Sequence, residues 1–163
     1  MKVKVQKLTD LDLARWAAEM TMRDKKSFIG LDTIYTNKHS LIYTQLFKIE
    51  MFDIPYAQHV HFRTHSANGL VHFVSTSRPD LVDVPERYGK VNHGMLCNAM
   101  HLIDMSHKRL CYKAEDLTLH LMRLIQDEIY EVDPALARHL EPMCSYLGRC
   151  PEGANTCGMY KEW

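Results

Sequence analysis

The stretch His93–Val132 reads HGMLCNAMHLIDMSHKRLCYKAEDLTLHLMRLIQDEIYEV and contains no proline and a single glycine. Apolar and small residues recur along it mostly at steps of three and four, the spacing that places side chains on one face of a helix. They are Leu96, Ala99, Ile103, Ser106, Leu110, Ala114, Leu117, Leu121, Leu124 and Ile129. The pattern predicts one long helix, or two helices in line, against which the rest of the chain packs.

The first half of this stretch also carries polar side chains other than the usual Glu and Lys. They are Asn98, His101, Asp104, His107 and Arg109. Residues three apart are neighbours on a helix, and Arg109 would follow Asn98 three turns later on nearly the same face. An amide and a guanidinium aligned in this way suit a ring edge and a phosphate. A stripe facing solvent or another subunit would look the same, and composition alone favours that simpler interpretation.

Composition bounds the class of protein. The 163 residues are 46% hydrophobic and 25% charged, which predicts a single globular domain over residues 1–163 with a substantial core. No apolar run reaches the length of a membrane helix, and the first ten residues lack a signal-peptide core, so we expect a cytoplasmic protein. The formal net charge is zero, which argues against direct nucleic-acid binding but leaves room for a small anionic ligand.

Shorter patterns predict the remaining elements. Asn68-Gly69 marks a turn, and Asp133-Pro134 marks a helix start. Residues 56–62 fit a helix or a strand equally well. The predicted strands cover 2–5, 41–51 and 70–77, with a turn at 52–55; the predicted helices cover 9–22, with Thr9 as cap, 31–35 and 135–140; a surface loop covers 78–92, and the tail from 143 is irregular.

Cysteine and histidine suggest metal chemistry in two places. In the tail 141–163, Cys144, Cys150 and Cys157 could converge with His139 on a zinc ion, although free thiols or a disulfide would fit the same spacing. Cys97 and Cys111 are more simply packed thiols.

A second group, His59, His61, His65 and His72, surrounds the Asn-Gly turn. On a strand, His59 and His61 would share a face and could hold a metal. Polar residues lining a cleft or interface are the simpler reading. The chain has no GxGxxG, GxxxxGK[ST], HExxH or GxSxG motif.

The order of several short segments resembles the flavin-dependent thymidylate synthases. The resemblance covers residues 31–140, and its gap-free part lies on the predicted long helix. The segments are His39-Ser40-Leu41-Ile42, Pro55, Thr64-His65-Ser66, Ser75-Thr76-Ser77-Arg78, Asn98-Ala99, Leu102, Arg109, Ala114-Glu115 and Pro134. Similar short proteins with a Cys-containing tail occur among bacteriophage relatives of this family, so the chain resembles a divergent, short, bacteriophage-type member.

The resemblance implies an α/β fold with a mixed sheet and long packed helices, assembled as a homo-oligomer, a tetramer in the family. It also implies transfer of a one-carbon unit to a deoxyuridine-type pyrimidine nucleotide, with FAD, folate and NADPH as cofactors. The implied residues are Arg109, Arg78, Ser75 and Thr76 at the nucleotide, and His65, Asn98, Arg63 and His39 at the flavin; no catalytic residue is assigned.

Four positions depart from the family pattern. Thr64 and Ser66 stand where the family has arginines, and Met100 and Asp104 also replace family residues. Because each charge-assisted hydrogen bond contributes about 1.5–3 kcal/mol, these losses predict weaker FAD binding. An alternative is therefore a catalytically decayed nucleotide-binding or protein-interaction module with the same fold. A metal-dependent activity at the tail cysteines is a third hypothesis.

Overall fold

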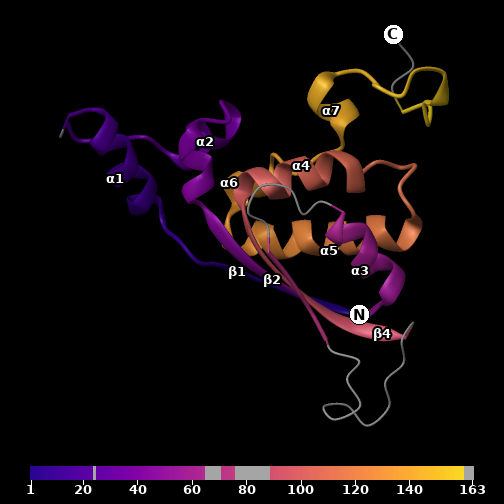
Figure 1. The fold of residues 1–163 in the computed structure, drawn as a ribbon. Helices are drawn as coiled ribbons and strands as arrows, with labels where there is room; N and C mark the ends of the chain where they lie inside the picture. Colours follow the sequence, from indigo (N-terminus) through magenta and orange to yellow (C-terminus); the bar gives the residue numbers. More distant parts are fainter. Residues whose placement is uncertain (24, 65–70, 76–88, 160–163) are drawn as a thin grey trace.

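The computed structural model describes residues 1–23, 25–64, 71–75 and 89–159. A four-stranded sheet in the order β1-β2-β4-β3 forms its centre (Figure 1). The strands are β1 (Lys2–Lys7), β2 (Leu46–Pro55), β3 (Val71–Val74) and β4 (Lys90–Asn98). The α/β class is confirmed. All three strand pairings are antiparallel, so the sheet in the described residues is not the mixed one that was expected.

The stretch His93–Val132 is not one helix. Its first six residues end β4, where His93, Met95 and Cys97 alternate inward between more exposed neighbours. Helix α4 (Ala99–Arg109) follows, and α5 (Asp116–Val132) begins after a six-residue connection. The two helices are not in line either, because the chain turns back and α5 runs below α4 (Figure 1). Over His93–Asn98, buried and more exposed residues alternate with the period of a strand, and this short alternation lies within the longer stretch that has helical spacing.

Strand β2 differs from prediction at both ends. The 3-10 helix η1 (Ser40–Thr44) replaces the start of the predicted strand. At the other end, the predicted turn is a β-bulge within the strand, since the pairing with β4 passes from Met51 to Ile54 against a single intervening residue of β4. Asp53 takes up the irregularity with a φ of 56°.

The predicted helices at 9–22, 31–35 and 135–140 are present over 11–21, 31–36 and 134–137. Asp10 rather than Thr9 caps the first helix, because the Thr9 hydroxyl instead bonds the carbonyl of Thr44 and the amide of Leu46. Residues 56–62 prove helical, and the tail contains helical turns where an irregular chain was expected. The helices are α1 (Leu11–Thr21), α2 (Leu31–Thr36), α3 (Tyr56–Arg63), α6 (Pro134–Ala137), α7 (Met143–Leu147) and the 3-10 turn η2 (Gly153–Asn155).

The core lies between the sheet and the helices α3, α4 and α5, which cover the same face of it (Figure 1). Helices α1 and α2 extend beyond one end of the sheet. Among the described residues, none of the helices combines the length and the apolar character that crossing a bilayer requires. The Asn-Gly turn and residues 78–88 of the predicted loop lie outside the described residues, whereas residues 90–92 of that loop form the start of β4.

Candidate functional site

The end of α3, the end of α4 and the start of α5 meet at one corner of the molecule. Arg109, the last residue of α4, donates from Nη2 to the carbonyl of His61 at 2.9 Å and to Oγ1 of Thr64 at 3.0 Å. A helix end carries unpaired carbonyls and a partial negative charge, so a guanidinium is favourable there. Partial burial lowers the pKa of Arg109 from its ordinary value, but arginine remains charged in proteins.

Glu115, just before α5, connects the start of α5 to α3 at this corner. Its Oε2 accepts hydrogen bonds from Nε2 of Gln58 at 3.0 Å, and from the amide and hydroxyl of Thr118 at 2.8 and 2.9 Å. Glu115 is exposed, and the limited desolvation of its carboxylate acts to raise its pKa, but the hydrogen bonds from Gln58 and Thr118 outweigh this and lower the pKa to about 2. Nδ1 of His61 lies 2.7 Å from Oγ1 of Thr118. The corner therefore holds a fixed anion, a fixed cation and an imidazole.

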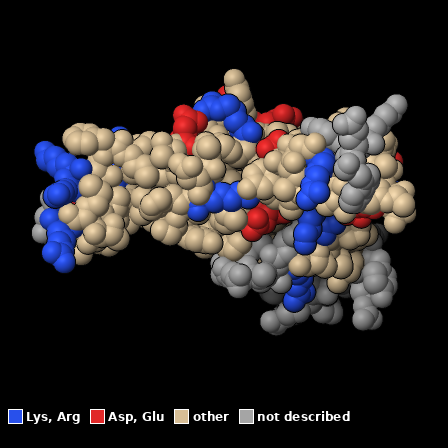
Figure 2. Space-filling view, turned by 90° about the horizontal axis from the view of Figure 1, so that it is seen from above, with Lys and Arg blue, Asp and Glu red and all other residues tan. Residues whose placement is uncertain are grey.

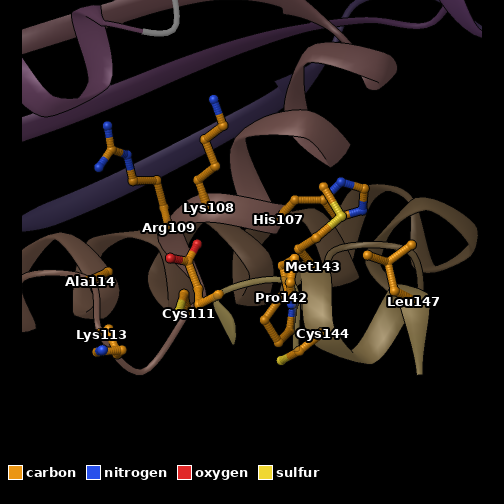
Figure 3. Close-up of a pocket in the computed structure, with 12 residues that line it drawn as sticks. His107, Lys108, Arg109, Cys111, Lys113, Ala114, Pro142, Met143, Cys144 and Leu147 are labelled. Atoms are coloured by element: carbon orange, nitrogen blue, oxygen red, sulfur yellow. The ribbon is translucent and has the colours of Figure 1, made fainter. Parts of the chain in front are cut away.

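A cleft of about 540 Å³ lies at the end of α4, between the α4–α5 connection and α7 (Figure 3). Lys108 and Arg109 project from α4 away from Cys144, which comes from α7. The wall is largely apolar and carries three cations and one carboxylate. The lining residues are His107, Lys108, Arg109, Cys111, Lys113, Ala114, Pro142, Met143, Cys144, Leu147, Pro151 and Glu152.

The predicted nucleotide and flavin residues do not all converge. Asn98 and Arg109 lie at opposite ends of α4, about 16 Å apart along the helix axis. Asn98 caps α4 by accepting a hydrogen bond from the amide of His101 at 3.0 Å, and Nδ1 of His101 accepts from the amide of Asn98 in return. Nδ1 of His39 caps η1 at the amide of Leu41. These two side chains therefore have local structural roles.

Arg63 and Ser75 lie elsewhere. Arg63 is exposed at the last position of α3, one residue before Thr64. Ser75 extends the pairing of β3 with β4, because it exchanges hydrogen bonds with Asn92 through its amide and its hydroxyl. The predicted residues His65, Thr76 and Arg78 lie outside the described residues. Two of the predicted nucleotide and flavin residues, Arg109 and Arg63, lie at the same end of α3.

The predicted zinc site in the tail is not supported. In the described part of the chain, no group of three or more His, Cys, Asp or Glu side chains could hold a metal ion. Helix α7 separates the expected ligands: Cys144 faces the cleft beside Cys111, whereas His139 packs edge-on against Tyr35 at a ring distance of 6.1 Å. Cys150 is buried and Cys157 exposed, and all five thiols are free, so the disulfide alternative is absent as well.

The histidines around β3 form a buried cluster rather than a strand pair. Because residues 56–63 are helical, His59 and His61 point to different sides of α3. His59 packs edge-on against His93 at a ring distance of 4.7 Å, and Nδ1 of His72 lies 2.8 Å from Nε2 of His93. Burial, followed by the charges of the neighbouring histidines and Arg63, lowers the pKa of His93 to about 3.

No sequence pattern joins Gln58, His61, Glu115 and Thr118 into one network. The only signal was local: Glu115 and Thr118 are three apart at the start of α5, the spacing of a helix cap. Their connection to α3 depends on contacts between residues 57 positions apart in the sequence.

The helical face carries charged side chains of both signs in the part of the chain that the structure describes. Figure 2 shows Lys and Arg side chains in separate groups with Asp and Glu between them.

No protein-family model and no curated protein matches this chain in sequence. Solved structures do match it. One is the flavin-dependent thymidylate synthase ThyX of Helicobacter pylori complexed with FAD and dUMP, with a TM-score of 0.69 and 15% identity over 86% of this chain and 100% of the other. A second structure of this enzyme, also with FAD and dUMP, has a TM-score of 0.64 and 15% identity over 83% and 99%. The chain thus has the ThyX fold over nearly the whole length of these structures.

Proposed function

We propose that the chain is a thymidylate synthase-like protein that binds a deoxyuridine-type nucleotide and a flavin. One observation carries the proposal: the fold matches nearly complete chains of an enzyme whose structures contain FAD and dUMP. The corner at the end of α3 adds local support, because Arg109 offers a charged donor group suited to a phosphate or a pyrimidine edge.

The donor groups present are of the right chemical type for a flavin dinucleotide. Two guanidinium groups, Arg63 and Arg109, stand at the end of α3, and the side-chain amide nitrogen of Asn98 is left over after helix capping. Bound FAD would supply the redox chemistry, and these residues would hold its phosphates and ring edge. Arg109 already donates hydrogen bonds to two groups of α3. These bonds hold its guanidinium in a fixed position, where its positive charge can attract the ligand.

The finer features also belong to this proposal. They are one-carbon transfer to the pyrimidine ring from a folate, reduction by NADPH, assembly as a homo-tetramer and descent from a bacteriophage-type short form. The whole chain, residues 1–163, acts as one domain.

The experiment is an absorbance spectrum of the purified protein followed by calorimetric titration with dUMP. We expect a flavin spectrum and saturable dUMP binding. Arg109→Gln should weaken dUMP binding roughly tenfold or more, because a charge-assisted hydrogen bond contributes about 1.5–3 kcal/mol. Arg123→Gln is the matched control, since Arg123 lies exposed on α5 over the ring of Tyr112.

Two outcomes would contradict the proposal. A colourless protein that binds neither added FAD nor dUMP is not a thymidylate synthase-like enzyme. Tight dUMP binding without flavin and without turnover would instead identify the decayed nucleotide-binding module.

A further inference from the structure

A chain of hydrogen bonds beside Arg109 ends at His61. The chain runs from the carboxylate of Glu115 to the hydroxyl of Thr118 at 2.9 Å, and from that hydroxyl to Nδ1 of His61 at 2.7 Å. Thr118 is fully buried and His61 half-buried, which shields the bond between these two side chains from bulk water, whereas Glu115 is exposed. The hydrogen bonds therefore fix which atom carries each proton.

The proton positions follow from the number of hydrogens available. Glu115 accepts three hydrogen bonds at one oxygen and acts as an ionised carboxylate. The hydroxyl of Thr118 has a single hydrogen, which goes to Glu115, so its oxygen must accept from His61. His61 therefore carries its hydrogen on Nδ1. In the neutral ring the lone pair is then on Nε2, directed away from Thr118.

The second ring nitrogen of His61, Nε2, is not engaged by Thr118. Within the part of the chain that the structure describes, no residue hydrogen-bonds this atom. The carbonyl of the same residue accepts from Arg109, so a cation from α4 is held at the turn of α3 that carries the proton acceptor. An anchored carboxylate behind an imidazole orients the ring and stabilises its protonated form, the arrangement that general bases use.

We propose that His61 is the proton acceptor of this site, with Thr118 and Glu115 as its positioning residues. The inference rests on the proposed function for its ligand, a uracil-type nucleotide. When a one-carbon unit replaces a ring hydrogen, the ring C–H bond breaks, the proton goes to Nε2 and the electron pair stays in the ring. Glu115, acting through Thr118, stabilises the imidazolium that forms.

The first test needs no turnover. Long-range proton–nitrogen NMR spectra of the ¹⁵N-labelled protein distinguish the two neutral tautomers of His61. We expect the Nδ1–H form in the wild type, loss of this preference in Thr118→Val, and its return in Thr118→Ser. The exposed His120 on α5 is the control and should not change. An Nε2–H tautomer in the wild-type protein would overturn the proposal whether or not the variants fold.

The second test adds the ligand. At dUMP concentrations shown to be saturating by calorimetry, the Nε2 resonance of His61 should shift, and no shift would overturn the proposal. His61→Gln should keep dUMP binding within a few-fold but lower kcat about 100-fold or more, the usual contribution of general base catalysis. An unchanged kcat would also overturn it. Absence of dUMP binding by calorimetry would refute the proposed function instead, while the tautomer result would still stand.

Discussion

Asp133 is a buried carboxylate on which three parts of the chain converge. It is 2% exposed and accepts hydrogen bonds from Nζ of Lys7 at 2.6 Å, the hydroxyl of Tyr35 at 2.7 Å and the amide of Leu136 at 3.0 Å. Burial and the adjacent carboxylate raise the pKa of Tyr35, so its phenol remains a donor. One side chain thus joins β1, α2 and α6.

We predict that Asp133→Ala lowers the free energy of unfolding by about 3–5 kcal/mol, because it leaves a largely buried lysine without its partner. Urea unfolding at pH 7 measures this loss. Asp32→Ala is the control: Asp32 pairs with Arg138 at the surface, and its loss should cost less than about 1 kcal/mol. Equal losses in the two variants would show that the buried network does not stabilise the fold.

The contact of α3 with β3 and β4 depends on neutral histidines. His59, His72 and His93 all have pKa values lowered mainly by burial, and His93 has a pKa of about 3. Arg63 on α3 adds to this effect. In the unfolded chain the same residues take up protons near pH 6.5. Stability from these contacts is therefore complete above pH 6.5 and declines as the pH falls toward 3.

We predict that the free energy of unfolding falls by about 2–3 kcal/mol between pH 7 and pH 4.5 on account of His93 alone, since one pKa unit corresponds to 1.36 kcal/mol. Urea unfolding at several pH values measures the slope. His93→Phe should flatten it, because the phenyl ring can pack against Phe62 without binding a proton. His120→Gln, at an exposed position, should leave it unchanged. A slope that His93→Phe does not alter would contradict the assignment.

At the scale of the whole molecule, the helices that cover the sheet all lie on one face of it. The opposite face presents side chains that are apolar and exposed in β3 and β4: Val71 is 42% exposed, Phe73 61% and Leu96 37%. Val71 and Leu96 are directly paired, so these side chains are adjacent. Contiguous apolar groups on an open sheet face are typical of a surface that another copy covers.

We therefore predict that the protein is a homo-oligomer and that Phe73→Lys reduces its mass to that of the monomer. Light scattering coupled to size-exclusion chromatography measures the mass. Trp16→Lys is the control, because Trp16 is similarly exposed but lies on α1, beyond one end of the sheet. A monomeric wild type, or an oligomer that Phe73→Lys does not affect, would contradict this use of the sheet face.

The sequence by itself determined the position of most helices and strands. Local chemistry sets caps and turns, so the pattern at Asp133-Pro134 gave the start of α6 correctly, and helical spacing located α5. The resemblance predicted the fold correctly, while its assignment of Arg109 to a nucleotide stays a prediction. The same helical spacing failed at His93–Asn98, since those residues become a strand only through pairing with Leu46–Met51 across the sheet.

Only the tertiary structure decided which of these residues meet. Asn98 and Arg109 share a helix but lie at its two ends, and the tail cysteines that share a spacing do not share a site. His61 becomes a potential proton acceptor only because α3 and α5 bring it to Thr118. Such contacts depend on how apolar faces pack, and packing joins residues whose separation in the chain leaves no periodic signal.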